Sequence, residues 1–348
     1  MAEAFINAIG TAVPDQDIHQ PFLDWALARI ADPRHARLFE RMVARSGLEH
    51  RWSVLPSAPN GGSPAEPGGF YGRETLPGTA ERMRFYGEAA PALALRAIDA
   101  LDGDLSGITH LVVASCTGFV APGVDQIIAR RLGLSPSVER LLVGYMGCYA
   151  ASVALRSARH IVRSDPAARV LVVTVELCSL HLHEMDEIEP MLAGLQFGDG
   201  SAAALVTGDP HGLRLGTPFS ATLPESNELI RWDITDKGFV MHLSGEVPGR
   251  IGAALAEPDM REAIVNGGVE EWGVHAGGRS ILDAVENALQ LPPDSLDDSR
   301  AVLRAFGNMS SSTLMFVLQR KFGRQFDAGV AIAFGPGLAA EGFRFASA

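Results

Sequence analysis

Three residues that lie far apart along the chain could act together in acyl-transfer chemistry. Cys148 lies in MGCYAA, His275 in WGVHAGG and Asn308 in FGNMSSS. A thiolate can attack a carbonyl carbon, an imidazole can exchange a proton, and an amide N–H₂ can donate to an oxyanion. These residue types, in this order, indicate a cysteine-based acyl transfer.

Each of the three residues follows an apolar run and precedes a helical pattern. Such runs, rich in β-branched residues, are typical of strands buried on both faces, and their alternation with helices indicates the α/β class. Sites in this class lie where strand ends meet helix N-termini. We therefore predict strand-to-helix junctions at Cys148, His275 and Asn308. The predicted strands are 110–116, 140–148, 169–178, 201–208 and 329–335, and the predicted helices are 149–163, 280–291 and 312–323.

Cys148 stands at the expected start of a helix, where backbone N–H groups and the helix dipole stabilise an anion. We therefore expect a lowered pKa for its thiol. Gly147 allows the chain to turn sharply before it. The other two cysteines, Cys116 and Cys178, form no CxxC pair and are expected to be buried as small hydrophobic residues. An odd number of cysteines favours a reducing, cytoplasmic location.

A cysteine, a histidine and an asparagine in this order fit two chemistries. In papain-like hydrolysis the asparagine orients the histidine, whereas in decarboxylative Claisen condensation both residues donate to an oxyanion. Papain-like enzymes carry the cysteine near the mature N-terminus, usually beside disulfides. Cys148 lies in the middle of the chain after a buried strand. The sequence therefore favours condensation.

The composition excludes several other classes of protein. The 348 residues are 47% hydrophobic and 20% charged, as in an ordinary globular protein. A net charge of -12 disfavours binding to nucleic acid or to an anionic membrane. The longest apolar runs reach only about half a bilayer, so we expect no membrane span, and the N-terminus has no signal-peptide pattern.

Several motifs together resemble the chalcone-synthase-type, or type III, polyketide synthases, from about residue 5 to the C-terminus. They are GCYAA, LQFGDGSAAALV, GFVMHLSGEVPG, WGVHAGGRSILDAVE, GNMSSSTLMFVL and AFGPGLAAEGF. VASCTGFVAPGVD is closer to the bacterial branch. The resemblance implies a five-layered αβαβα thiolase fold with two similar halves, residues 1–210 and 211–348. It also implies a homodimer in which each protomer holds a complete catalytic set.

The resemblance further implies a role for each motif residue. Cys148 would carry the acyl group as a thioester, and His275 would stabilise the thiolate as the cation of an ion pair. His275 and Asn308 would stabilise the enolate formed when malonyl-CoA loses CO₂. Phe197 matches an aromatic gatekeeper beside the malonyl carboxylate, where an apolar face disfavours the charge; core packing is the alternative. The substrates would be acyl-CoA and malonyl-CoA, with no cofactor.

A basic stripe offers a site for the CoA phosphates. Arg37, Arg41 and Arg45 recur every four residues and share one helix face. Arg41 and Arg45 match basic CoA-binding positions of the family, whereas the third position is Leu38, a departure for which Arg37 would compensate. A solvated helix face is the alternative.

The cavity expected from the resemblance departs from that of the plant enzymes. Met241 replaces a second phenylalanine gatekeeper, and Cys116 replaces a small hydroxyl residue. His181 and Trp232 add bulk where plant enzymes have small residues. Cys178 and Ser310 complete the predicted wall. We therefore expect an aliphatic starter that gives an alkylpyrone or alkylresorcinol, or malonyl units that give a small phenolic.

Two other segments need an interpretation. HLHEMDEIEP (181–190) places His181 and His183 among carboxylates, but such clusters are usually solvated, and we predict no metal. The Pro/Gly-rich segment 55–72 is either a lid or a plain connecting loop.

Two rival functions stay open. One is a β-ketoacyl synthase III-like enzyme that works with acyl carrier protein. The other is a non-catalytic binding protein of the same fold. The AFGPGL ending disfavours the first, and the intact set of Cys148, His275 and Asn308 disfavours the second.

Overall fold

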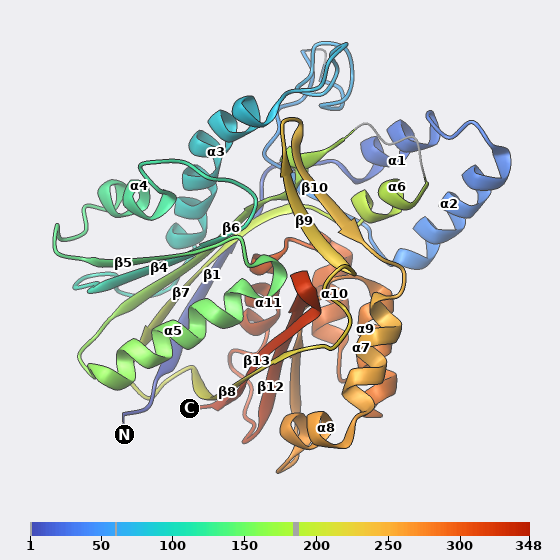
Figure 1. Ribbon diagram of the computed structural model, residues 1–348. Coiled ribbons are helices and arrows are strands. Elements are labelled where there is room, and N and C mark those ends of the chain that lie inside the picture. The colour runs from blue at the N-terminus through green and yellow to red at the C-terminus, as the bar shows by residue number, and fades with distance from the viewer. Residues whose placement is uncertain (1, 60, 184–187) are drawn as a thin grey trace.

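The computed structural model describes residues 2–59, 61–183 and 188–348. Nine strands form one sheet in the order β11-β12-β13-β8-β1-β7-β6-β4-β5 (Figure 1). Their bounds are β1 Phe5–Ala12, β4 His110–Ser115, β5 Glu139–Gly144, β6 Val170–Leu177, β7 Asp199–Thr207, β8 Leu213–Thr222, β11 Glu271–Val274, β12 Gly329–Gly335 and β13 Ala339–Ser347. Two short pairs stand apart: β2 Gln16–Asp17 with β3 Trp52–Ser53, and β9 Ile230–Thr235 with β10 Gly238–Leu243.

The helices cover both faces of the sheet and also fill its middle. They are α1 His19–Leu27, α2 Pro33–Ser46, α3 Thr79–Asp99, α4 Val124–Arg131, α5 Ala150–Ser164, α6 Ile188–Gly194, α7 Val247–Ala256, α8 Pro258–Val265, α9 Arg279–Leu289, α10 Asp297–Phe306 and α11 Ser311–Gln319. Short 3₁₀ turns occur at Gly147–Tyr149, Cys178–His181 and Pro336–Leu338. None of the helices in the described ranges is long and apolar enough to cross a membrane.

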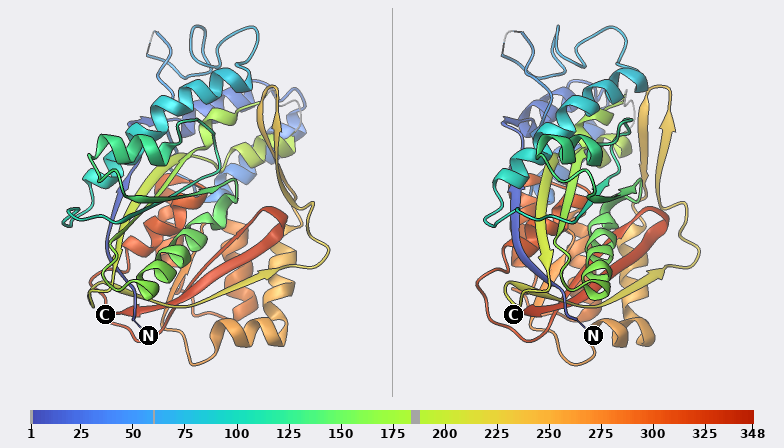
Figure 2. Two further views of the ribbon diagram at one scale, coloured as in Figure 1. Left: turned by 60° about the vertical axis from the view of Figure 1, so that its left-hand side comes forward. Right: turned by 90° about the vertical axis from the view of Figure 1, so that its left-hand side faces the viewer.

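The sheet bends so that its two ends face each other across α5 and α11 (Figure 2). The two central helices contact strands from both halves of the chain, β6 and β7 on one side and β12 on the other. Helices α3 and α4 cover the outer face of the first group of strands, and α7, α9 and α10 cover that of the second. The resulting order, helix, sheet, helix, sheet, helix, confirms the predicted five-layered αβαβα thiolase fold.

The two groups of strands are joined where β1 meets β8. Strand β1 pairs antiparallel with β7 along its length, and its first residues, Phe5 and Ile6, pair with Arg214 and Leu213 of β8. Strand β4 pairs parallel with β5 and β6, and β11 pairs parallel with β12. The sheet is therefore mixed, and strands from before and after residue 210 share one ladder.

Two expectations about these elements were wrong. Residues before Asn308 were expected to end a strand, but they form α10, because Val302 and Leu303 bury one face of a helix. Strand β5 was expected to be buried on both faces, but it is the edge of the sheet, where Leu141 is 42% and Leu142 45% exposed. The remaining predicted strands and helices occur within a few residues of their predicted bounds.

Candidate active site

Cys148 lies in the 3₁₀ turn Gly147–Tyr149 that connects β5 to α5, and its side chain is buried. Gly147 has a φ of +76°, and a Cβ there would lie 2.4 Å from Cδ of Pro336. Only glycine fits both the left-handed backbone and the close approach of this proline. The chain therefore turns at Gly147 and presents Cys148 to the end of β12.

His275 and Asn308 reach Cys148 from two other elements. His275 follows the last residue of β11, and Asn308 lies between α10 and α11. All three residues line one cavity of about 40 Å³, which we call the small cavity. The predicted gatekeeper Phe197 and most of the predicted cavity-wall residues meet there as well; the latter are Cys116, Trp232, Met241 and Ser310.

The side chain of Asn308 is held in one orientation. Its Oδ1 accepts a hydrogen bond from the backbone N–H of Ser310 (2.8 Å), and its Nδ2 donates to the carbonyl of Gly277 (3.2 Å). Its backbone pairs with the segment that carries Phe197, because Asn308 N donates to Gln196 O (2.7 Å). The amide therefore presents N–H₂, and not its oxygen, toward the cavity side of Gly277.

His275 is the group with unused hydrogen-bonding capacity. Its ring is 1% exposed, and neither Nδ1 nor Nε2 has a partner in the structure. Burial lowers the pKa of His275 to about 3, so the ring is neutral at physiological pH. A neutral imidazole offers one donor and one acceptor, and no protein group occupies either of them here.

The expected low pKa of the Cys148 thiol was wrong. Burial raises the pKa of Cys148 to about 11, although hydrogen bonds from Ser310 and Asn308 pull it down. A single 3₁₀ turn does not offset the loss of water around the thiolate. His275 has no hydrogen bond to the sulfur, so the expected ion pair does not form in this structure. Both groups are neutral, and a proton must move when Cys148 reacts.

Two cavity residues hold strained backbone. Tyr145 and Ser310 both line the small cavity and have positive φ values, 58° and 49°, although neither is glycine. Such conformations cost free energy and gather at functional sites. The Tyr145 hydroxyl donates to Trp232 O (2.6 Å), which ties the turn before Cys148 to β9. Tyr145 could not be predicted as part of the site, since no sequence pattern marks a left-handed tyrosine.

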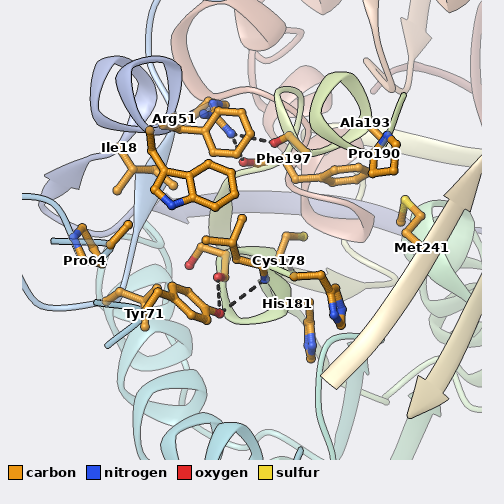
Figure 3. A pocket seen from close by; sticks show the side chains of 18 of the residues that line it. Ile18, Arg51, Pro64, Tyr71, Cys178, His181, Pro190, Ala193, Phe197 and Met241 are labelled. Atoms are coloured by element: carbon orange, nitrogen blue, oxygen red, sulfur yellow. Dashed lines mark hydrogen bonds between the residues drawn. The ribbon is translucent and has the colours of Figure 1, made fainter. Parts of the chain in front are cut away.

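A second, larger cavity of about 250 Å³ adjoins the first, and we call it the large cavity (Figure 3). Phe197, Trp232 and Met241 line both cavities and so form the partition between them. Trp232 of β9 and Met241 of β10 are direct partners in the hairpin, which explains why they act together. The remaining predicted wall residues, Cys178 and His181, line the large cavity.

The Pro/Gly-rich segment 55–72 forms part of this wall. Leu55, Ser63, Pro64, Ala65 and Tyr71 line the large cavity. Helix α1 and the segment before it supply further apolar surface with Ile18, Phe22 and Trp25. The segment thus contributes to the wall of the large cavity in addition to connecting β3 to α3.

His181 is a hydrogen-bonded core histidine. Its ring stacks on Phe239 with centroids 4.3 Å apart. Its Nε2 bonds to Thr117 O (2.7 Å), and its Nδ1 accepts from Phe239 N (3.1 Å). Burial lowers the pKa of His181 to about 3, so it is neutral. Within the described residues no group of three metal-binding side chains gathers, and residues 184–187 of the acidic segment lie outside them.

A buried carboxylate lies behind the small cavity. Glu176 of β6 accepts hydrogen bonds from the hydroxyls of Ser311 (2.5 Å) and Thr117 (2.8 Å) and from the backbone N–H of Cys116 (3.0 Å). Burial raises the pKa of Glu176 to about 7. The Cys116 thiol also lies 3.2 Å from the Ser310 hydroxyl. A single glutamate within the apolar run VLVVTVEL is the sequence signal that could have identified this buried carboxylate.

A third cavity, of about 240 Å³, lies next to the catalytic set, and two arginines and one aspartate, Asp283, line it. Its wall includes Arg45, Gln196, Gly278 and Arg279. Gln196 and Gly278 directly neighbour residues that line the small cavity, Phe197 and Gly277. Arg37 and Arg41 are exposed on α2, but they are not among the residues that line this cavity. Arg279 donates to Arg45 O (3.1 Å) and forms an ion pair with Asp283 (3.7 Å), and no sequence pattern marked it.

Two protein-family models match the chain. The model described as chalcone and stilbene synthases, N-terminal domain, matches residues 1–210, and the corresponding C-terminal domain matches residues 215–348. The alpha-pyrone synthesis polyketide synthase-like Pks18 of Mycobacterium tuberculosis is 36% identical over 286 residues. This match covers 76% of the present chain and 72% of the relative. The Pks18 of Mycobacterium bovis matches with the same values.

Solved structures give the same relationship over the whole chain. The C-terminal type III polyketide synthase domain of Steely1 from Dictyostelium superposes with a TM-score of 0.86 at 29% identity, covering 99% of both chains. PKS-I from the brown alga Ectocarpus siliculosus gives 0.85 at 26% identity, covering 100% of this chain and 99% of the other.

Proposed function

Because the chain belongs to the chalcone and stilbene synthase family and is a type III polyketide synthase, we propose that it extends an aliphatic acyl-CoA with malonyl-CoA and closes the product to an alkyl-α-pyrone. One observation carries this proposal. The small cavity of Cys148, His275 and Asn308 adjoins, across Phe197, a larger apolar cavity that suits a hydrocarbon chain.

The first step loads the starter on Cys148. Its thiol is protonated at neutral pH, and the ring of His275 has a free acceptor nitrogen on the same cavity. As the sulfur attacks the thioester carbon of the acyl-CoA, its proton passes to His275. The bond to the CoA sulfur then breaks, and the proton leaves with the CoA thiol. Catalytic hydrogen bonds often tighten only when substrate is bound.

The second step uses the same cavity for condensation. The C–C bond to the malonyl carboxylate breaks, CO₂ leaves, and the electron pair remains as an enolate. The N–H₂ of Asn308 and a ring N–H of His275 donate to the enolate oxygen. The enolate carbon attacks the thioester on Cys148, the C–S bond breaks, and the chain leaves on CoA two carbons longer. The Cys148 thiolate takes up this chain again for the next round.

Phe197 supports decarboxylation by its position on the partition. Beside an apolar ring, the negative malonyl carboxylate is disfavoured relative to neutral CO₂. We assign the CoA moiety to the third cavity, where Arg45, and Arg279 beside its ion-pair partner Asp283, can meet its phosphates. The chemistry needs no resident cofactor.

The cavity sizes support an α-pyrone as the product. Two extensions of a starter give a 3,5-diketo thioester, whose enolised C5 oxygen can attack C1 and release the thiol. The resulting ring is small, and its alkyl substituent can stay in the large cavity. The name of Pks18 refers to alpha-pyrone synthesis. An alkylresorcinol or a small phenolic would require a longer or differently folded intermediate.

We further propose a homodimer that uses the edge strand β5. Leu141 and Leu142 on this edge, and Phe119 near it, are 42%, 45% and 44% exposed. An exposed apolar edge strand is avoided in monomers, and a second copy of the chain would cover it. Light scattering after size-exclusion chromatography should give twice the mass of one chain. The three free, buried thiols support a reducing compartment, and we propose the cytoplasm.

The decisive experiment incubates the purified protein with radiolabelled malonyl-CoA and a panel of acyl-CoAs, and identifies the products by mass spectrometry. Cys148→Ala is the control. We expect alkylpyrones with the wild type and none with the variant. Consumption of malonyl-acyl carrier protein without turnover of CoA esters would instead support the β-ketoacyl synthase III-like rival. Binding of CoA esters without turnover by the wild type would support the non-catalytic rival.

A further inference from the structure

Arg51 is a buried cation at the wall of the large cavity (Figure 3). It is 1% exposed. Its Nη1 donates to the carbonyls of Gly194 (2.9 Å) and Phe197 (3.0 Å), and its Nε donates to Nδ1 of His19 (3.2 Å). The ring of Phe22 covers one face of the guanidinium at 4.5 Å. The remaining nitrogen, Nη2, is buried and has no hydrogen-bond partner.

The other polar side chains of this wall are already engaged. The Tyr71 hydroxyl donates to Ser179 O (2.9 Å), and the Ser179 hydroxyl donates to Asp199 (2.6 Å). His181 is bonded through both ring nitrogens, and His183 through Nε2. Among the described residues that line the large cavity, Arg51 alone has a buried side-chain nitrogen or oxygen without a partner. Such a group is rare in native proteins, and a bound water or a ligand is the usual partner that satisfies it.

The charge of Arg51 is also uncompensated at close range. Burial lowers the pKa of Arg51 to about 9, so the guanidinium stays charged at neutral pH. No carboxylate in the described part of the chain forms an ion pair with the guanidinium; Asp17 accepts from the backbone N–H of Arg51 (3.2 Å), and Asp17 and Asp199 act on the guanidinium only through their charge. A buried cation is stabilised best by an anion that accepts its free N–H.

The walls around Arg51 are otherwise apolar, with Ile18, Phe22, Trp25 and Leu55 among them. A ligand that satisfies both features has a hydrocarbon chain and one anionic oxygen group at its end. The thioester end of the chain would lie at Cys148 on the other side of Phe197.

We propose that Arg51 binds a carboxylate at the far end of the acyl starter, so that the large cavity selects a chain carrying a thioester at one end and a carboxylate at the other. This inference rests on the proposed function. Arg51 is then a specificity residue. Its second function is to hold the backbone at Gly194 and Phe197, which carries the partition.

The test compares matched starters on the wild-type enzyme, so it does not depend on a variant that folds. Hexanoyl-CoA is paired with adipoyl-CoA, octanoyl-CoA with suberoyl-CoA, and decanoyl-CoA with sebacoyl-CoA. The two members of each pair have equal carbon numbers and differ in their far end, methyl or carboxylate. For the length that reaches Arg51, we expect kcat/KM for the carboxylate-ended member to exceed that of its methyl-ended partner by about tenfold.

Two variants assign this preference to Arg51. Arg51→Met keeps the aliphatic stem without the charge and should reverse the ratio in favour of the methyl-ended member. Arg51→Lys keeps a cation and should retain part of the preference. Arg45→Met is the matched control, because it acts on the CoA shared by all starters and should lower kcat/KM for both members equally. Thermal unfolding of each variant verifies its fold.

The outcomes separate this inference from the proposed function. If methyl-ended starters react better at every length and Arg51→Met leaves the ratio unchanged, Arg51 is only a clamp on the backbone and the inference is overturned. If neither series yields product or acylates Cys148, the proposed function itself fails.

Discussion

The small and the large cavity share three wall residues, Phe197, Trp232 and Met241, but differ in how their polar groups are satisfied. In the small cavity both ring nitrogens of His275 are without partners, and Tyr145 and Ser310 hold left-handed backbone. In the large cavity nearly every polar side chain is bonded within the protein, with Nη2 of Arg51 as the exception. The first cavity therefore resembles a site prepared for charge that develops during reaction, and the second resembles a container for a chain.

This contrast assigns catalysis to the small cavity and the choice of starter to the large cavity. Groups that stabilise a transition state must be free before substrate binds, and the protein accepts the cost of leaving them unpaired. A container for a hydrocarbon chain needs shape and apolar walls, so its polar atoms are best satisfied internally. Changes in the small cavity should therefore reduce rate for all starters, whereas changes in the large cavity should alter preference among them.

The largest effect is expected from the donors of the small cavity. His275→Ala and Asn308→Ala should each lower the rate of malonyl-CoA decarboxylation by about 10²-fold to 10³-fold, because each removes one donor to the enolate oxygen. Release of CO₂ from labelled malonyl-CoA measures the rate. His160→Ala and Asn287→Ala, at exposed positions of α5 and α9, are the matched controls and should stay near the wild type. Equal losses in all four variants would refute the assignment.

The next largest effect is expected in the pH dependence of the reactivity of Cys148. Since burial raises the pKa of its thiol to about 11, the thiolate fraction is small at neutral pH and grows with pH. The rate of alkylation of Cys148 by iodoacetamide should rise about tenfold per pH unit between roughly pH 7 and pH 10, without a plateau below pH 9. Cys148→Ala supplies the background from Cys116 and Cys178. A plateau already at pH 6 would mean that an ion pair with His275 exists before substrate binds.

Filling part of the large cavity should reduce activity with long starters only. Cys178→Phe should fill part of that cavity and lower kcat/KM for decanoyl-CoA by about tenfold, with little change for acetyl-CoA. The nearly isosteric Cys178→Ser should keep the wild-type order of starters. Mass spectrometry of products from an equimolar mixture of acyl-CoAs records the preference. Loss of activity with acetyl-CoA as well would contradict the separation between the two cavities.

The smallest effect is expected in the third cavity. Arg45→Ala and Arg279→Ala should each raise KM for malonyl-CoA by about threefold to tenfold with little change in kcat, since surface-accessible charge pairs are weak and screened by salt. Arg37→Ala, two turns before Arg45 in α2 and exposed, should have a smaller effect. Steady-state kinetics at two salt concentrations distinguishes the three variants. A larger increase in KM for Arg37→Ala than for Arg279→Ala would support the exposed face of α2 as the CoA site instead.

The sequence by itself determined the class of the molecule. Near-continuous apolar runs identified β6, β7 and β12, because strands buried on both faces are made mostly of apolar residues. Cys148, His275 and Asn308, with their neighbouring motifs, identified the chemistry. Local patterns carry this information, since propensity and burial periodicity act over a few residues.

Only the tertiary structure decided how those residues behave. The pKa of Cys148 rose instead of falling, because desolvation depends on all the elements packed around the thiol, and a helix start is only one of them. The partition at Trp232 and Met241, the third cavity with Arg279, and the unpartnered nitrogen of Arg51 all arise from segments far apart in the chain. The sequence of β5 predicts a buried strand, yet β5 lies at the edge of the sheet and is exposed. The position of a strand within a sheet is set by the topology and not by the strand's own residues.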